Sequence, residues 1–328
     1  MREIIKKVPI PTAGVALGLA ALGNLLQPYT EIVHIVCGAL ALFLIVMLAA
    51  KIILFPGMIR DDLHNSIMAS VSATLFMTLM QLAGYLAPLA YIPAFVLWSA
   101  AIIAHLALMG WFTVRFISHF KLHEVFPTTL SATWASSWPP PPPPLRHGAG
   151  RPRAVLVRIR LLPGAACRGD VPLHEARSAR KRPSLFCIYT APMSLSIVGY
   201  LATAPEPNLL FVGVMLVLAQ ALFAVVLFRL PVLLRLKFYP SYAAMTFPFV
   251  ITATALGKAL AFFAASGMVV PELLSVLFVA ETAVSVVMVG YVFGHYLHFF
   301  FKRIEAPQSA AVIRENKQIA RFSEHFEN

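Results

Sequence analysis

Charged residues are scarce in this 328-residue chain, and acidic residues are the scarcest. Only 12% of the residues are charged and only 14 are Asp or Glu, whereas 59% are hydrophobic and the mean hydropathy is +0.79. A soluble globular protein carries about 25% charged residues. The composition therefore excludes a soluble globular protein and predicts an all-α integral membrane protein with several spanning helices.

Motifs for catalysis and metal binding are also missing from the sequence. The three cysteines, Cys37, Cys167 and Cys187, have neither metal-ligand spacing nor the pattern of a disulfide framework. No motif for nucleotide hydrolysis, zinc hydrolysis or a serine nucleophile occurs. We therefore expect no enzyme, no cofactor and no metal, and an ATP-driven pump is disfavoured.

The basic net charge has a local origin. The chain carries +12 at neutral pH, but residues 146–182 hold ten of the 26 basic residues and only two acidic ones. That window supplies +8 of the +12. The basicity therefore gives no reason to expect a nucleic-acid partner.

Eight apolar segments are long enough to be membrane helices. They lie near 11–27, 31–55, 66–86, 91–118, 186–204, 207–230, 238–265 and 273–300. The connections between them alternate between those without Lys or Arg and those rich in basic residues, which the positive-inside rule places in the cytoplasm. We expect both termini inside and an even number of spans, eight or ten. The basic start, with no small-residue cleavage site and with more spans following it, is interpreted as a cytoplasmic anchor rather than a signal peptide.

The odd-numbered segments share small and polar residues. Pro11 and Pro192 are each followed seven residues later by glycine, Gly18 and Gly199, and Pro248 heads a run rich in Thr and Gly. The even-numbered segments are bulkier and aliphatic, as lipid-facing helices are. This alternation predicts helical-hairpin repeats around a central pore, with helix kinks at the three prolines and hairpins starting near residues 11, 66, 127, 186 and 238. Close helix packing alone also explains the small residues.

Residues 131–184 break the pattern, because this segment is basic and holds ten of the 25 prolines. A disordered loop is the ordinary interpretation. The genetic code permits another: if the codons of 133–138 are read from their third base, Val-Gly-Ile-Val-Val-Ala becomes available, and other offsets give apolar sequence further on. We hypothesise that this aberrant segment of a single 1–328 transport domain is a frameshifted version of helices 5 and 6. The nucleotide sequence tests it.

The segment Phe238–Ala265 is the most informative span. Pro248 interrupts it after the bulky Phe247, and the small residues Thr252 and Thr254 follow. A gated pore requires one stretch in which bulky side chains block the passage and another in which small side chains leave it open. A kinked helix packed by ordinary aromatic side chains is the alternative.

Three stretches resemble one transporter family. KVPIPTAGVALGLAALGNLL at 7–26, FCIYTAPMSLSIVGYLA at 186–202 and FYPSYAAMTFPFVITATALGKAL at 238–260 are similar to the tellurite-resistance and dicarboxylate transporters, a family that includes the plant guard-cell slow anion channels. The resemblance implies ten helices in five hairpins, a homotrimer with one pore per subunit, and a phenylalanine that closes each pore. Phe247 matches that gate, and Gly14 matches the small residue beside it. We expect a protein of the bacterial inner membrane.

Polar and small residues of the odd-numbered segments are candidates for lining such a pore. They are Gly14, Gly18, Ser194, Ser196, Thr252 and Thr254. Hydroxyl groups and exposed amides can replace part of an anion's water without binding the anion too tightly. Serine and threonine also commonly bond back to their own helix.

Two charges fall inside the spans, Lys258 and Glu281, and a structural ion pair between them is the preferred interpretation. A lysine that attracts substrate or a glutamate that couples transport to protons is the alternative. Uncharged polar residues in the spans, among them Gln81 and Gln220, are expected to bond helix to helix.

The sequence thus predicts transport of small inorganic or organic anions across a lipid bilayer through a phenylalanine-gated pore. It does not identify the anion. A proton-coupled exporter of organic acids or sulfite, or a non-functional pseudogene product, remains the alternative.

Overall fold

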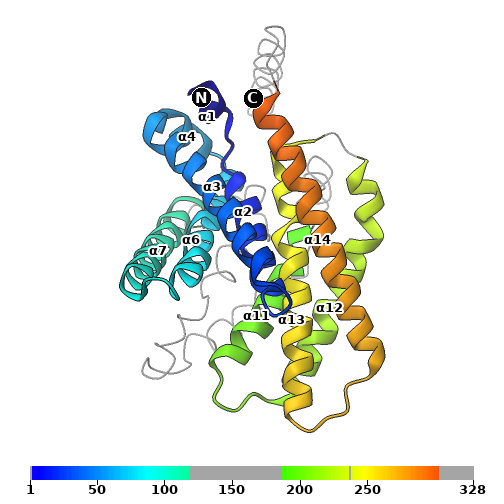
Figure 1. Ribbon diagram of the computed structural model, residues 1–328. Helices are drawn as coiled ribbons and strands as arrows, with labels where there is room; N and C mark the ends of the chain where they lie inside the picture. The colour runs from blue at the N-terminus through cyan, green and yellow to red at the C-terminus, as the bar shows by residue number, and fades with distance from the viewer. Residues whose placement is uncertain (1, 118–186, 189, 236–237, 303–328) are drawn as a thin grey trace.

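The computed structural model in Figure 1 describes residues 2–117, 187–188, 190–235 and 238–302. Every regular element in these ranges is helical, which confirms the predicted all-α membrane fold. The elements are α1 (Arg2–Lys7), α2 (Thr12–Leu26), α3 (Glu31–Leu54), α4 (Pro56–Leu63), α5 (Ser66–Val71), α6 (Ala73–Leu86), α7 (Tyr91–Phe112), the π-helix η1 (Thr113–Ile117), α11 (Ala191–Thr203), α12 (Leu209–Leu234), the 3₁₀ helix η4 (Pro240–Met245), α13 (Phe247–Ala265) and α14 (Glu272–Phe301). The aberrant segment 131–184, with the frameshift hypothesis, lies outside the described residues.

All eight predicted spans are helical, but they differ in length. Six stretches of helix are long and apolar enough to cross a membrane, whereas α2 and α11 have only 15 and 13 residues. Helices of that length rise about 22 and 20 Å, less than the ~30 Å of a bilayer's hydrocarbon core. The short helix α2 is interior, since 13 of its 15 residues are buried, whereas α11 has five buried residues among its 13.

Within the described residues, the helices pack as four hairpins: α2 with α3, α6 with α7, α11 with α12, and α13 with α14. The first helix of each hairpin is the inner one. The inner helices pack against one another in the order α6, α2, α13, α11. Burial agrees with this arrangement, since 61% of the α13 span is buried against 22% of the α7 and α14 spans. Small residues are concentrated in α2, whereas the inner helix α6 buries the bulky Met77, Met80 and Leu82, so small side chains mark the inner helices only in part.

The three prolines begin helices rather than bend them. Pro11 directly precedes α2, whereas Pro192 and Pro248 are the second residues of α11 and α13. The break in the segment 238–265 falls at Thr246, between η4 and α13. The predicted kinks inside continuous helices are therefore corrected to helix starts. Proline is favoured there because the first turn of a helix has no partner for the missing N–H.

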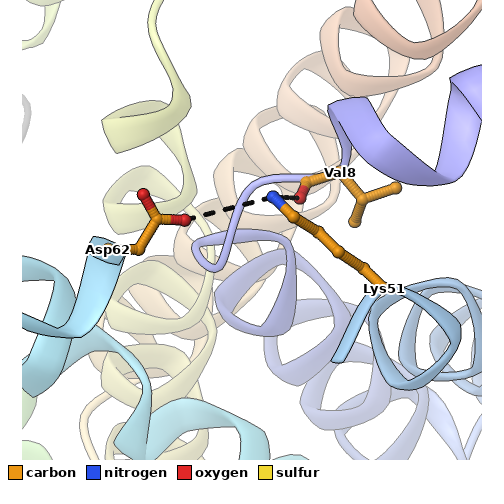
Figure 2. A network of polar contacts seen from close by, with 3 residues as sticks. All are labelled: Val8, Lys51 and Asp62. Carbon is orange, nitrogen blue, oxygen red and sulfur yellow. Dashed lines mark hydrogen bonds and ion pairs between the residues drawn. The ribbon is translucent and has the colours of Figure 1, made fainter. Parts of the chain in front are cut away.

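Two lysines hold one end of the bundle together. The Lys51 Nζ at the end of α3 donates to the Val8 carbonyl oxygen, 2.7 Å away, and lies 4.0 Å from an Asp62 carboxylate oxygen of α4 (Figure 2). The Lys7 Nζ donates to the carbonyl oxygen of Lys302, just after α14, at 2.9 Å. These contacts fix the segment that leads into α2.

Candidate pore and gate

Phe247 is the first residue of the inner helix α13, and its side chain is buried, with only 7% of it exposed. The ring of Phe249, two residues on, packs edge to face on Phe223 of the outer helix α12, with 5.5 Å between ring centroids. Side chains two residues apart on a helix point about 200° apart. Phe247 therefore points away from Phe223 of α12, and its low exposure shows that it packs among the described helices.

Gly14 and Gly18 lie where α2 packs against the start of α13. A Cβ atom at Gly18 would come within 2.6 Å of the Thr246 Cβ and 3.2 Å of the Phe247 nitrogen, and one at Gly14 within 3.3 Å of the Ala243 Cβ. The first of these distances is too short for two carbon atoms. The glycines thus let α2 approach the backbone that carries Phe247, and both are buried.

The four candidate hydroxyls bond within or between the inner helices. Ser196, Thr252 and Thr254 each donate to the carbonyl oxygen four residues earlier, at 2.8 Å. The Ser194 hydroxyl donates to the Thr190 carbonyl at 3.1 Å and lies 3.2 Å from the Thr252 hydroxyl. Ser194 and Thr252 therefore join α11 to α13.

Comparison with known protein families gives a match for the first part of the chain. Residues 7–137 match the voltage-dependent anion channel family, SLAC1. This range holds the first two hairpins and confirms the family resemblance there, whereas α11 to α14 lie beyond it. The match supports an integral membrane protein and transport of anions across the membrane. No curated protein matches the chain.

Glu281 and Lys258 do not form the predicted ion pair. Both carboxylate oxygens of Glu281 are buried and make no hydrogen bond within the described residues, and Lys258 is exposed. Gln220 of α12 interacts with the carboxyl group without a hydrogen bond of standard geometry. The register explains this result. Gly257 faces the Phe278 ring, so Glu281 lies level with about residue 254, one turn away from Lys258.

Three polar contacts between the inner helices extend the site beyond its predicted residues. The Thr246 hydroxyl donates to the Gly14 carbonyl oxygen at 3.0 Å. The Tyr85 hydroxyl of α6 donates to the Ala20 carbonyl oxygen at 2.7 Å. The Asn24 side chain donates to Gln81 at 2.7 Å, which confirms the helix-to-helix bond expected of Gln81.

Sequence reasoning missed the first two of these contacts. Thr246 stands at an N-cap position, which predicts a hydrogen bond to its own helix rather than to Gly14. Tyr85 also packs against Gly38 of α3, where a Cβ atom would come within 2.6 Å of its ring, and the sequence does not show which helices are neighbours.

Proposed function

We propose that this chain carries small anions across the membrane through a passage between the inner helices, and that the ring of Phe247 closes the passage. The observation that supports this most directly is the place of Phe247: it is buried, on an inner helix, and turned away from the outer helix beside it. The family match over 7–137 supports the anion as the transported species.

A ring in this position blocks ions in two ways. It fills a narrow passage, and its apolar surface disfavours the water that an anion needs around it. Once the ring moves, the hydroxyl and backbone groups nearby offer contacts too weak to hold the anion. Selectivity then comes from width, which suits small inorganic anions and small carboxylates, including dicarboxylates and tellurite. A homotrimer with one passage per chain is the assembly we propose with it.

Replacement of Phe247 by alanine tests the gate. In liposomes that hold purified protein, Phe247→Ala is expected to increase chloride flux at least tenfold, because the stopper is removed while the packing of α13 on α12 is kept. Phe249→Ala is the matched control: it leaves flux low and costs about 3–5 kcal/mol of stability, since it empties the α12–α13 contact. Equal flux in the wild type and Phe247→Ala would refute the gate.

A proton-coupled carrier is the second candidate, because Glu281 is buried and forms no ion pair among the residues that the structure describes. Ionisable groups in such a setting serve as proton carriers in transporters. Glu281→Gln is then expected to abolish the pH dependence of anion uptake while the Phe247→Ala leak remains. Glu272→Gln, at the exposed start of the same helix, is the control and keeps the pH dependence. If anion uptake still depends on pH in the Glu281→Gln protein, the proton-coupled carrier is ruled out.

A further inference from the structure

Thr246 lies at the hinge between η4 and α13, directly before the proposed gate. Its backbone angles, φ −106° and ψ −83°, are not those of either helix, and its carbonyl oxygen accepts the first hydrogen bonds of α13, from Phe249 and Val250. The side chain is fully buried. Any movement of Thr246 therefore moves the first residue of α13, which is Phe247.

The hydroxyl of Thr246 does not cap its own helix. Threonine at this position ordinarily accepts a hydrogen bond from an N–H of the first helical turn, but no such bond is formed here. The hydroxyl instead approaches two carbonyl oxygens, that of Gly14 in α2 at 3.0 Å and that of Ala243 in η4 at 2.7 Å. A hydroxyl has one proton to donate. The Thr246 proton is therefore shared between a neighbouring helix and the hinge.

The packing around Thr246 is as specific as its hydrogen bonds. Gly18 sits against the Thr246 side chain, and a Cβ atom at Gly18 would lie 2.6 Å from the Thr246 Cβ and 2.7 Å from its Oγ1. Glycine at 18 thus leaves the space that the threonine fills. Contact with α2 is made by both shape and hydrogen bonding at the residue next to the ring.

We propose that Thr246 is a positioning residue, which clamps the start of α13 to Gly14 and Gly18 of α2 and so holds the Phe247 ring in its closing position. The inference rests on the proposed function of Phe247. Opening then requires the hydrogen bond from the Thr246 hydroxyl to the Gly14 carbonyl oxygen to break. The hydroxyl keeps the Ala243 carbonyl oxygen as its acceptor. The clamp can release without leaving a buried hydroxyl unsatisfied, which keeps the cost of opening small.

Removal of the hydroxyl tests the clamp. Thr246→Val keeps the shape of the side chain but cannot donate, and it is expected to raise chloride flux in liposomes about fivefold, as the loss of one net hydrogen bond predicts. Thr246→Ser keeps the donor and is expected to stay within about twofold of the wild type. Thr246→Ala serves as a second hydroxyl-free variant if the valine variant does not purify as a folded protein. Thr282→Val, whose hydroxyl bonds only within α14, is the matched control and leaves flux unchanged.

The same substitution in a Phe247→Ala background separates a clamp from a general structural role. If Thr246 acts through the ring, Thr246→Val adds less than about twofold to the flux of Phe247→Ala. An equal increase in chloride flux in both backgrounds overturns the clamp. A Thr246→Val protein that stays closed while Phe247→Ala leaks also overturns it. The gate at Phe247 stands in both cases. No leak from Phe247→Ala overturns the gate and the clamp together.

Discussion

Lys51 shows how a single charged residue is accommodated in an apolar helix. Its side chain is 4% exposed, and its Nζ is satisfied by the Val8 carbonyl oxygen and the Asp62 carboxylate rather than by water. Because Val8 leads into α2, the lysine fixes the entry to the innermost helix. Removing a buried cation with these two partners is expected to destabilise the protein, because the partners are left without their donor.

Lys51→Met is therefore expected to lower the free energy of unfolding by about 2 kcal/mol, because the Val8 carbonyl oxygen loses a charged donor. Chemical denaturation in detergent measures the change. Lys7→Met, which removes a similar bond to a carbonyl oxygen at an exposed site, is the control and changes stability by less than about 0.5 kcal/mol. Equal losses from the two substitutions would show that burial of Lys51 does not matter.

Asp62 makes stability depend on pH. Burial raises the pKa of the Asp62 carboxyl above its ordinary value; the charge of Lys51 offsets part of that rise, and Asp61 adds to it. The folded protein thus binds this proton more tightly than the unfolded chain does. The contribution of Asp62 to stability is fully present below the ordinary pKa and is lost as pH rises through the raised pKa.

Comparison with Asp62→Asn isolates this effect. As pH rises from about 4 towards neutral, the wild type is expected to lose thermal stability relative to Asp62→Asn, which has no carboxyl group to titrate. Melting temperatures of both proteins across that range provide the measurement. Parallel curves would mean that the carboxyl titrates alike in the folded and unfolded chains.

Residue type predicted the site only in part. The gate at Phe247 was predicted from its place before Pro248 together with the family resemblance, and it stays a prediction. The Lys258–Glu281 pair was wrong, because helix register decides which charges meet and the sequence does not give the register of α13 against α14. Whether Ser194 and Thr252 face a passage stays a prediction, although their contact with each other shows that they also join helices.

At the scale of the helix, glycine sets how closely α2 approaches its neighbours. Gly18 meets Thr246 with no room for a methyl group, whereas Gly290 of α14 has no atom within 4 Å of an added Cβ. Gly18 is thus needed for close packing between helices, whereas Gly290 is not, although both lie in helices. The sequence marked α2 as an inner helix by its small residues but could not show which glycine is in contact.

Gly18→Ala is expected to cost about 1–3 kcal/mol of stability, because the new methyl group forces α2 and α13 apart. Gly290→Ala is the matched control and is expected to be neutral or to stabilise α14 by up to about 1 kcal/mol, since alanine favours helix. Unfolding in detergent distinguishes them. A Gly18→Ala protein as stable as Gly290→Ala would contradict the close contact.

Helix starts were harder to predict than helix identity. Size and polarity separate inner from outer helices in part, because lipid and protein neighbours select different side chains. A proline, by contrast, fits either the first turn of a helix or a kink within one, and only the preceding residues distinguish these. For α13 the break came at Thr246, where the 3₁₀ helix η4 ends.

At the scale of the whole molecule, the described hairpins place the basic connections at one end. Lys7 and Lys302, close to the two ends of the described chain, are joined there by a hydrogen bond. The positive-inside rule predicts that this end lies in the cytoplasm, and the orientation stays a prediction. The order of the inner helices could not be predicted from the sequence, because it depends on contacts between distant hairpins.

Cysteine labelling tests this topology. In a background without the native cysteines, Lys6→Cys and Arg60→Cys are expected to react only from the cytoplasmic side, and Leu89→Cys and Met268→Cys only from the other side, because all four positions are exposed in the connections or beside them. A membrane-impermeant maleimide on intact cells and on inverted vesicles gives the measurement. Labelling of Lys6→Cys and Met268→Cys from the same side would contradict the four-hairpin arrangement.

If the frameshift hypothesis for 131–184 is correct, the natural protein has more hairpins than the four described. The frameshift hypothesis predicts a fifth inner–outer pair, and the nucleotide sequence tests it directly. Anion conductance of the chain beside a version restored to frame then shows whether this pair is needed to complete the passage. Restored and unrestored chains with the same conductance would make the pair dispensable.

The most direct test of the account is single-channel conductance in a planar bilayer for a series of side chains at position 247. If an aromatic ring at this point blocks the passage, conductance falls with side-chain size: Phe247→Ala conducts most, Phe247→Leu less, and Phe247→Trp no more than the wild type. The same conductance across all four proteins would place Phe247 outside the path of the anion.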